Sequence, residues 1–252
     1  MLKKILVLSL AAMMIFSANI GVAAAEAGNT QYSITQAQGF TKETEVKRVI
    51  DPDKPMVALT FDDGPSKYTP EILQVLKENN SEATFFVLGT EANRYKDTLN
   101  QIIENGNQVG NHTYNHEDLT KLSDEDVYRQ VQGTNDIIYN VSGYTATIMR
   151  PPYGASDEEL NKKISRPVIK WSIDTRGWEN RNTQMILDNI FNNVKDGDII
   201  LMHDLYETTA EAAKIAVPKL IEMGYQLVTI DELSRYKELP LTAGKQYYNM
   251  YK

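Results

Sequence analysis

The chain has 252 residues, which suits one domain of ordinary size with a full hydrophobic core. Its formal net charge is −8 at pH 7, and no basic stripe or aromatic RNA-binding pattern offsets this acidity, which argues against nucleic acid as a partner. Cysteine is absent, so we expect no disulfide in the fold and no lipid-anchoring cysteine at the end of a leader.

Residues 1–25 have the pattern of a secretory signal peptide. A basic start is followed by an uncharged apolar stretch and by three small residues, Ala23–Ala25, before the first acid. We expect cleavage and export, which would place the protein outside the cell or in the cell wall. An uncleaved, membrane-anchored leader is the alternative, since the uncharged stretch is just long enough to span a bilayer. Residues 26–54 are polar with weak periodicity and are expected to form an N-terminal extension.

Apolar runs and helical patterns alternate along the rest of the chain. The apolar runs predict about seven strands, near 56–59, 83–88, 108–111, 146–149, 168–173, 198–202 and 226–230. The helical patterns predict a helix with Thr69 as its N-cap, a helix over 91–104, helices capped by Ser123 and Ser156, and helices over 185–194 and 210–223, the last kinked at Pro218. This alternation predicts an α/β fold built on a parallel sheet, either open or closed into a barrel.

Two adjacent carboxylates, Asp62 and Asp63, follow the first predicted strand, and Gly64-Pro65 ends the apolar pattern directly after them. A carboxylate pair at the mouth of a strand can divide its work, because one acid binds a cation while the other accepts a proton. For Asp-Asp-Gly alone, a solvated acidic turn is the more common interpretation.

Two of the three histidines, His112 and His116, lie four residues apart, just past another predicted strand. This spacing brings both imidazoles together on a helix face or in a tight loop, although two unrelated surface histidines are the alternative. Two neutral imidazoles and one carboxylate form a facial set of ligands that leaves metal positions open to water and substrate. Asp63 would be that carboxylate.

Groups able to carry chemistry follow five of the predicted strands. They are Asp62 and Asp63, His112 and His116, Arg150, Asp174, and His203. Barrels collect their chemistry around one rim at the carboxyl ends of the strands, whereas an open sheet uses mainly the loops at its switch point. The distribution therefore favours a distorted (β/α) barrel of about seven parallel strands in a single catalytic domain.

Over about residues 55–236 the chain resembles a polysaccharide deacetylase, the NodB-like domain of the fourth carbohydrate esterase family. Five motifs occur in the family's order, namely Thr60–Pro65, His112–His116, Arg150–Gly154, Asp174–Trp178 and Leu201–His203. The fourth departs from the pattern, because Gly177 stands where the family usually has a second aspartate. The resemblance implies a catalytic domain over 55–238, followed by a C-terminal tail over 239–252.

The resemblance also implies a metal and a base. Asp63, His112 and His116 would hold a divalent metal, with zinc as the expected ion and cobalt or another transition metal as alternatives. Asp62 would take the proton of the attacking water, and Arg150 would orient that carboxylate. Without the motif, Arg150 would be interpreted as one half of a weak surface salt bridge.

The remaining motif residues would serve the acetyl group and the leaving group. By the resemblance, the Tyr153 backbone N–H would join the metal in stabilising the oxyanion. His203 would protonate the leaving amine, and Asp174 would keep its imidazole charged until then. Trp178 and Leu201 would form an apolar slot for the acetyl methyl, although without the motif they are equally compatible with ordinary core positions.

Three functions remain open on the sequence alone. The first is metal-dependent removal of N-acetyl groups from N-acetylglucosamine residues of a polysaccharide, with peptidoglycan expected first and chitin-like oligomers next. The second is O-acetyl ester hydrolysis on xylan at the same site. The third is a non-catalytic carbohydrate-binding protein on the same fold. The intact set of ligands, base and acid favours an enzyme, with no evident protein partner and a monomeric state expected.

Overall fold

The computed structural model of the protein describes residues 48–252. The predicted signal peptide and most of the predicted extension lie outside the described residues. Within the described range, no helix is long and apolar enough to cross a membrane. The next residues of the predicted extension already contact the fold, since Arg48 donates a hydrogen bond to the backbone oxygen of Leu227 at 2.7 Å and Ile50 is buried.

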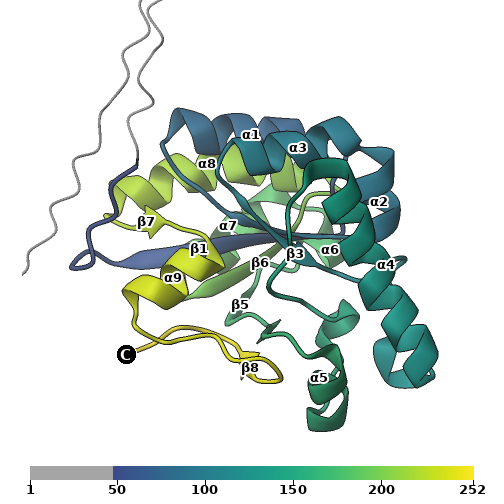
Figure 1. Ribbon diagram of the computed structural model, residues 1–252. Coiled ribbons are helices and arrows are strands. Elements are labelled where there is room, and N and C mark those ends of the chain that lie inside the picture. The colour runs from purple at the N-terminus through teal and green to yellow at the C-terminus, as the bar shows by residue number, and fades with distance from the viewer. Residues whose placement is uncertain (1–47) are drawn as a thin grey trace, which may run out of the picture. The chain divides into compact units, whose positions relative to one another are not determined.

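A parallel sheet with β1 at its centre organises the described chain (Figure 1). In spatial order its strands are β3 (Gln108–Asn111), β2 (Thr84–Val87), β1 (Met56–Asp62), β6 (Ile199–His203) and β5 (Ile173–Asp174). β7 (Gln226–Leu227) pairs with the first residues of β1. All these pairings are parallel, which confirms the predicted α/β class.

The predicted barrel is distorted, and its ring is not closed by a continuous ladder. Met149 forms single bridges to β3 and to β4 (Val168–Ile169). The chain then runs from β4 through Lys170 into β5, at the opposite edge of the sheet. β8 (Gln246–Tyr247) pairs with β4, so part of the segment expected as a tail packs within the same unit as the sheet.

Two predicted strands differ from the structure at this seam. The strand predicted over 146–149 is reduced to the bridge at Met149, and the strand predicted over 168–173 is divided into β4 and β5. The side chain of Arg150 explains the division, since its Nε donates to the Ile169 oxygen at 3.0 Å and its Nη2 donates to the Lys170 oxygen at 2.8 Å. A buried side chain, rather than a neighbouring strand, thus uses these two carbonyl groups.

Helices cover both sides of the sheet, with α1, α3 and α8 together on one side and α5 and α9 on the other (Figure 1). The helices of the described chain are α1 (Thr69–Glu78), α2 (Gly89–Arg94), α3 (Lys96–Glu104), α4 (Asp124–Ser142), α5 (Glu158–Ile164), α6 (Gly177–Asn180), α7 (Thr183–Phe191), α8 (Glu207–Glu222) and α9 (Ile230–Tyr236). The helix predicted over 91–104 is divided at Tyr95, whose φ of −112° and ψ of 53° lie outside the helical region. α8 runs through Pro218 as one helix.

The predicted helix caps are partly right. Ser123 caps α4 as predicted, since its Oγ accepts a hydrogen bond from the Asp126 N–H at 3.2 Å. α5 is capped by Asp157 rather than by Ser156, because the Asp157 carboxylate accepts from the Leu160 N–H at 2.8 Å. Thr69 is the first residue of α1 and not its N-cap, since its hydroxyl is hydrogen-bonded outside the helix.

Alternation along β1 divides its side chains between two cores. Leu59 and Phe61 pack against the helices α1, α3 and α8, and Phe61 stacks on Phe85 with ring centroids 5.0 Å apart. Met56 and Ala58 belong to a second cluster on the opposite face of the sheet. Because successive side chains of a strand point to opposite faces, Asp62 continues this second face at the carboxyl end of β1. The strand pattern thus points the Asp62 side chain away from α1, α3 and α8.

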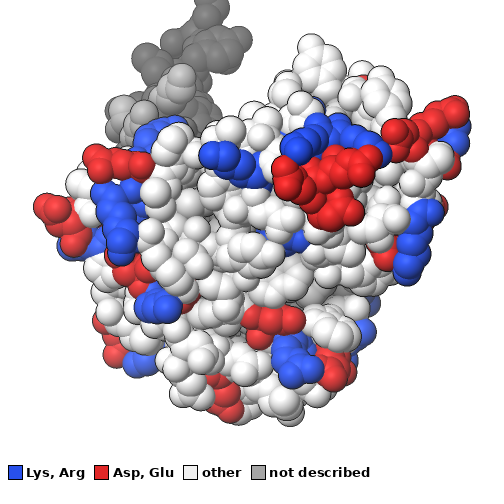
Figure 2. All heavy atoms as spheres, turned by 90° about the horizontal axis from the view of Figure 1, so that it is seen from below, with Lys and Arg blue, Asp and Glu red and all other residues white. Residues whose placement is uncertain are grey.

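Charged side chains of both signs are mixed on the face of the molecule seen in Figure 2. Several oppositely charged neighbours form exposed pairs, such as Lys162 with Glu158 at 2.7 Å. Such surface pairs add little to stability. The mixture leaves no continuous field of one sign on this face.

Candidate active site

Strand register places the first two candidate residues opposite each other at one edge of the sheet. β1 and β6 pair in parallel so that Asp62 lies beside His203. β3 ends at Asn111 on the same edge, and His112 follows it directly. The carboxyl ends of β3, β1 and β6 therefore lie on the edge of the sheet where the sequence predicts the chemistry.

Asp63, His112 and His116 converge as a possible set of metal ligands. One ligand atom from each residue lies within 4.8 Å of the others. Asp63 Oδ1 is 3.2 Å from His112 Nε2 and 3.4 Å from His116 Nε2. This oxygen is buried and has no hydrogen-bond partner among the described residues. A buried carboxylate oxygen facing two imidazole nitrogens fits a divalent cation, because that donor set suits zinc and similar transition metals.

The backbone around these ligands is held in an unusual conformation. Asp63 has φ 73°, Thr113 φ 73° and His116 φ 66°, all in the left-handed region that residues other than glycine rarely occupy. Hydrogen bonds fix the turn between the histidines, since Thr113 N–H donates to Asn111 Oδ1 at 2.8 Å and His116 N–H donates to Thr113 Oγ1 at 3.1 Å. In these conformations the side chains of Asp63 and His116 converge with that of His112.

His112 is oriented by a hydrogen bond at its Nδ1. Its Nδ1 lies 2.6 Å from the backbone oxygen of Arg150. A carbonyl oxygen only accepts, so Nδ1 carries a proton and Nε2 is the nitrogen that faces Asp63. Nε2 is therefore the nitrogen that would give its lone pair to a metal.

Asp62 and Arg150 form a buried ion pair next to the ligands. Arg150 is fully buried, and its Nη1 donates to Asp62 Oδ1 at 2.7 Å and to Thr60 Oγ1 at 2.8 Å. The guanidinium also packs over the Phe86 ring, 4.2 Å from its centroid. The interpretation of Arg150 as a surface salt bridge is therefore wrong, and Asp62 is held with its second oxygen 3.7 Å from His112 Nε2.

The electrostatics of the cluster follow from burial and mutual contact. Burial favours the neutral acid, but the close approach and the charge of His112 outweigh it and lower the pKa of Asp63 to about 2. Burial lowers the pKa of His112, yet the charges of Asp62 and Asp63 raise it above its ordinary value. Burial and the neighbouring His112 lower the pKa of His116. The cluster thus holds an ionised carboxylate beside imidazoles, ready for a cation.

Tyr153 lies in a short 3-10 turn, Pro152–Gly154, on the other side of the ligands. Its φ is 60°, and its ring meets the His116 ring edge-on with centroids 4.7 Å apart. Gly154 is needed here, since a Cβ at this position would lie 2.8 Å from the Trp171 ring. The Lys170 ammonium donates to the Gly154 oxygen. The segment between β4 and β5, through Lys170 and Trp171, therefore fixes the turn that carries the Tyr153 N–H.

His203 and Asp174 line the same pocket, and no hydrogen bond joins their side chains in the described part of the chain. His203 Nδ1 is buried without a hydrogen-bond partner in the described part of the chain, and Asp174 Oδ1 instead accepts from the Arg176 N–H at 2.8 Å. Burial lowers the pKa of His203, while the charges of the nearby carboxylates, Asp174 included, act in the opposite direction. Asp174 thus faces His203 through its charge rather than through a hydrogen bond.

A pocket of about 550 Å³ joins the candidate residues. Its lining includes every predicted site residue except Arg150, which is buried and reaches the pocket through Asp62. Leu201 is almost fully buried, whereas Trp178 is 45% exposed at the rim. An apolar wall of this kind leaves room for a small group such as a methyl.

Sequence reasoning missed three residues that line this pocket, Trp171, Arg181 and Tyr206. Trp171 falls within a predicted strand, and Arg181 and Tyr206 lie in connections between predicted elements, so no motif marks them. The Arg181 guanidinium lies 3.2 Å from the centroid of the Tyr206 ring, and its Nε donates to the Trp178 oxygen at 2.9 Å. Arg181 and Tyr206 thus form a stacked cationic and aromatic pair at the rim of the pocket.

Asp204 is a further buried acid that the sequence does not mark. Thr69 donates to its Oδ2, and Ser66 donates to its backbone oxygen. Burial raises the pKa of Asp204 to about 7. Its carboxylate lies so close to Gly64 that a Cβ there would be 2.3 Å from Oδ1. Asp204 thus holds the turn after Asp63 from the side of β6.

Gly177, which departs from the fourth motif, has a local packing explanation. A Cβ at this position would lie 2.8 Å from Ile186 Cδ1 and 3.0 Å from its Cγ1. Any side chain at 177 therefore requires Ile186 on α7 to move. In this chain the Ile186 side chain occupies the space that a side chain at position 177 would need.

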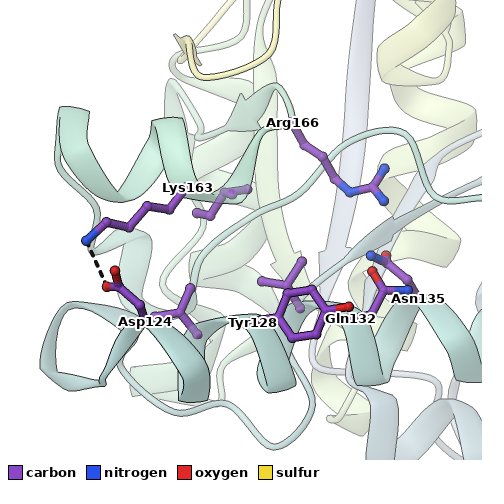
Figure 3. A pocket seen from close by; sticks show the side chains of 9 residues that line it. Asp124, Tyr128, Gln132, Asn135, Lys163 and Arg166 are labelled. Carbon is purple, nitrogen blue, oxygen red and sulfur yellow. Dashed lines mark hydrogen bonds and ion pairs between the residues drawn. The ribbon is translucent and has the colours of Figure 1, made fainter.

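A second hollow, of about 360 Å³, lies between α4 and α5 (Figure 3). Lys163 and Asp124 close one end of it with an ion pair of 2.8 Å, and Arg166 donates to the Ala146 backbone oxygen near the other end. It shares no lining residue with the pocket described above. The charged side chains of this hollow are engaged with one another or with backbone.

Sequence comparison agrees with the geometry of the site. Residues 50–167 match the polysaccharide deacetylase family. The chain is 42% identical over 193 residues to the peptidoglycan-N-acetylmuramic acid deacetylase PdaC of Bacillus subtilis, a match that covers 76% of this chain and 41% of PdaC. It is 34% identical over 197 residues to a peptidoglycan-N-acetylglucosamine deacetylase of Bacillus cereus, covering 72% of this chain and 89% of that protein. The chain thus spans about two fifths of the length of PdaC.

Structural comparison leads to the same group of proteins. The structure of PdaC from Bacillus subtilis matches with a TM-score of 0.74 at 43% identity, covering 75% of this chain and 94% of that chain. A family 4 acetyl xylan esterase from Clostridium thermocellum, in complex with a cobalt ion, matches with a TM-score of 0.73 at 29% identity, covering 77% of this chain and 98% of that chain. By sequence and by fold, this chain belongs to the polysaccharide deacetylase family.

Proposed function

We propose that this protein is a metal-dependent hydrolase that removes N-acetyl groups from a polysaccharide, with peptidoglycan as its substrate. One observation carries the proposal: the possible metal-ligand set Asp63, His112 and His116 lies beside the buried Asp62–Arg150 ion pair in one pocket. Ligands and a potential base occur together here, which a binding protein does not need. The membership of the chain in the polysaccharide deacetylase family supports the reaction class.

Asp63, His112 and His116 would hold the cation, and zinc is the ion we propose. The lone pair of His112 Nε2 and the unpartnered Asp63 Oδ1 support this assignment. The cobalt ion in the related esterase shows that a relative binds a transition metal. When bound, the cation would supply Lewis acidity toward water and toward the acetyl carbonyl.

The chain's own residues would move the protons. Asp62 would accept the proton of the attacking water, and Arg150 would hold this carboxylate in place through the 2.7 Å hydrogen bond from Nη1. The Tyr153 N–H would donate to the developing oxyanion. His203 would donate a proton to the leaving nitrogen, with the charge of Asp174 favouring its protonated form. Trp178 and Leu201 would enclose the acetyl methyl.

Arg181 supports peptidoglycan over a neutral polymer. It is the one lysine or arginine among the residues that line the pocket, and it forms no ion pair within the described part of the chain. Its stacking on Tyr206 and its bond to the Trp178 oxygen hold the guanidinium at the rim. Peptidoglycan carries carboxylates on its N-acetylmuramic acid residues and peptides, whereas chitin and acetylated xylan backbones are neutral. A fixed guanidinium is suited to bind such a carboxylate.

Acetate release from a panel of polymers tests the proposal. Peptidoglycan glycan strands, chitooligosaccharides and acetylated xylan are compared with the wild type and with Arg181→Gln. We expect the wild type to prefer peptidoglycan strands, and Arg181→Gln to lose that preference while keeping its rate on chitooligosaccharides. No acetate from any amide-linked acetyl group, with a fully loaded metal site, would refute N-deacetylation.

Acetyl xylan ester hydrolysis is a second candidate, because the Clostridium thermocellum esterase shares the fold over 98% of its chain. The same panel separates the two, since rapid release from xylan with none from peptidoglycan would identify an esterase.

We also propose that the protein is exported to the cell wall by its leader, since the named relatives act on peptidoglycan. Amino-terminal sequencing of secreted protein would locate the cleavage after Ala25, and a mature chain that begins at Met1 would contradict it.

A further inference from the structure

Lys170 is a buried lysine in the segment that joins β4 to β5. Its residue is 4% exposed, and within the described chain it forms no ion pair. Lysine is almost never fully buried unless it is paired, because a charged amine loses its hydration. Burial and the charge of Arg150 lower the pKa of Lys170 to about 8. The position therefore carries a cost that ordinary packing does not require.

The contacts of Lys170 reach two parts of the proposed reaction site. Its ammonium donates to the backbone oxygen of Gly154, at the end of the turn that contains Tyr153. Its own backbone oxygen accepts from Arg150 Nη2 at 2.8 Å, and Arg150 in turn holds Asp62. One residue thus contacts both the turn behind the Tyr153 N–H and the arginine behind the proposed base.

The Tyr153 turn needs such an anchor. Tyr153 has φ 60°, a conformation that costs a residue with a side chain and persists only where the surroundings hold it. Two backbone hydrogen bonds close the turn, from Gly154 N–H to Pro151 O at 3.1 Å and from Ala155 N–H to Pro152 O at 3.0 Å. Neither bond ties the turn to the sheet, whereas the Lys170 ammonium does.

We propose that Lys170 is a positioning residue, which fixes the Tyr153 N–H for oxyanion stabilisation by binding the Gly154 oxygen. The inference rests on the proposed deacetylase function. Loss of the ammonium would let the turn move. We expect the ligands to stay in place, since the hydrogen bonds of His112 Nδ1, Thr113 N–H and His116 N–H hold the histidine loop without Lys170. The effect would therefore fall on turnover and not on metal binding.

The test compares Lys170→Met with Lys170→Arg in the full chain loaded with zinc, using release of acetate from chitooligosaccharides. Methionine keeps the length and apolar character of the stem but removes the donor, whereas arginine keeps both donor and charge. Lys162→Met, at a lysine that is exposed on α5, is the matched control for loss of one positive charge. Bound zinc is measured by elemental analysis in each variant.

We expect Lys170→Met to lower kcat by about 10- to 100-fold, somewhat less than removal of a direct oxyanion donor, with KM and zinc content unchanged. Lys170→Arg should recover most of kcat, and Lys162→Met should match the wild type. A Lys170→Met variant with kcat within twofold of the wild type would overturn the inference. So would a folded, zinc-loaded Lys170→Arg variant with the low kcat expected for methionine, a measurement that remains available if Lys170→Met fails to fold. A wild type that is inactive on all acetylated polymers would instead refute the proposed function.

Discussion

Asp62→Asn is predicted to damage both turnover and stability, for two separable reasons. The amide cannot accept the proton of the attacking water, so kcat should fall by about two to four orders of magnitude, the usual worth of a general base. The substitution also leaves the fully buried Arg150 guanidinium without a negative partner. Metal content should remain near that of the wild type, because Asp63 and not Asp62 belongs to the ligand set.

The stability loss can be estimated from the contacts of Arg150. Breaking a buried ion pair by removal of one partner costs about 3–5 kcal/mol. Arg150 keeps its hydrogen bonds to the Thr60 hydroxyl and to the Ile169 and Lys170 oxygens, and an asparagine oxygen still accepts from Nη1. We therefore expect a loss near the lower end, about 3 kcal/mol, which lowers Tm by about 6–12 °C in a domain of this size.

The assay measures acetate release, bound metal and urea unfolding on the same preparations. Asp198→Asn is the matched control, since Asp198 is a similarly buried carboxylate at the opposite end of β6, where it accepts hydrogen bonds from the Ser172 hydroxyl and the Lys195 backbone N–H. It should lose stability and keep turnover. If Asp62→Asn kept turnover within tenfold of the wild type, or lost metal as strongly as Asp63→Asn, the division of roles between the two acids would be wrong.

Three further predictions concern the ligands, the buried acid and the fourth motif. Asp63→Asn and His116→Ala should lose metal and activity together, and added zinc should restore the activity of chelator-treated wild type. Full activity in a preparation that elemental analysis shows to be free of metal would refute the ligand set. Since the pKa of Asp204 is about 7 in the fold against 3.8 ordinarily, the fold retains a proton there that the unfolded chain loses, so its contribution to stability falls as the pH rises between these values. In chelator-treated protein, Asp204→Asn should therefore gain up to about 4 kcal/mol relative to wild type between pH 4 and pH 8, measured by urea unfolding, and a constant difference would contradict this. Gly177→Ala should cost about 1–3 kcal/mol by overpacking, and Ile186→Val in the same chain should recover much of it in thermal unfolding; an unchanged Tm for the single variant would argue against the clash.

Strand periodicity accounts for what the sequence predicted well. Apolar runs locate β1, β3 and β6, and the polar residues at their ends then share one edge because the sheet is parallel. Asp62 and His203 are an instance, since each ends a strand and the register pairs them directly. This inference needs no knowledge of loops, and for that reason it was reliable.

The seam of the barrel could not be predicted by the same reasoning. The division between β4 and β5 depends on the Arg150 side chain, which bonds the Ile169 and Lys170 oxygens from another part of the chain. The pairing of β8 with β4 likewise joins segments far apart in the sequence. Periodicity describes each segment in isolation, whereas these features arise from contacts between segments.

The rim of the pocket escaped prediction for a related reason. Arg181 and Tyr206 lie in separate connections, and their stacking follows from the packing of α6, α7 and α8 rather than from any local pattern. Asp174 is a second case, because its motif assigns it to the charge of His203 but does not show that its Oδ1 accepts a hydrogen bond from the Arg176 N–H. Motifs locate residues at a site, but they do not decide which neighbour each side chain contacts.

The left-handed backbone at Asp63, Thr113 and His116 has a consequence for how the site tells one ion from another. Each such residue costs about 1–3 kcal/mol and persists only where the surrounding contacts hold it. We therefore expect the ligand side chains to have little freedom to rearrange around an ion. Discrimination then falls to the fit between a fixed arrangement of two nitrogens and one oxygen and the coordination geometry that each ion prefers. A metal site of this kind selects ions by their coordination geometry. Among the ions that fit, those available where the protein works decide which one it binds.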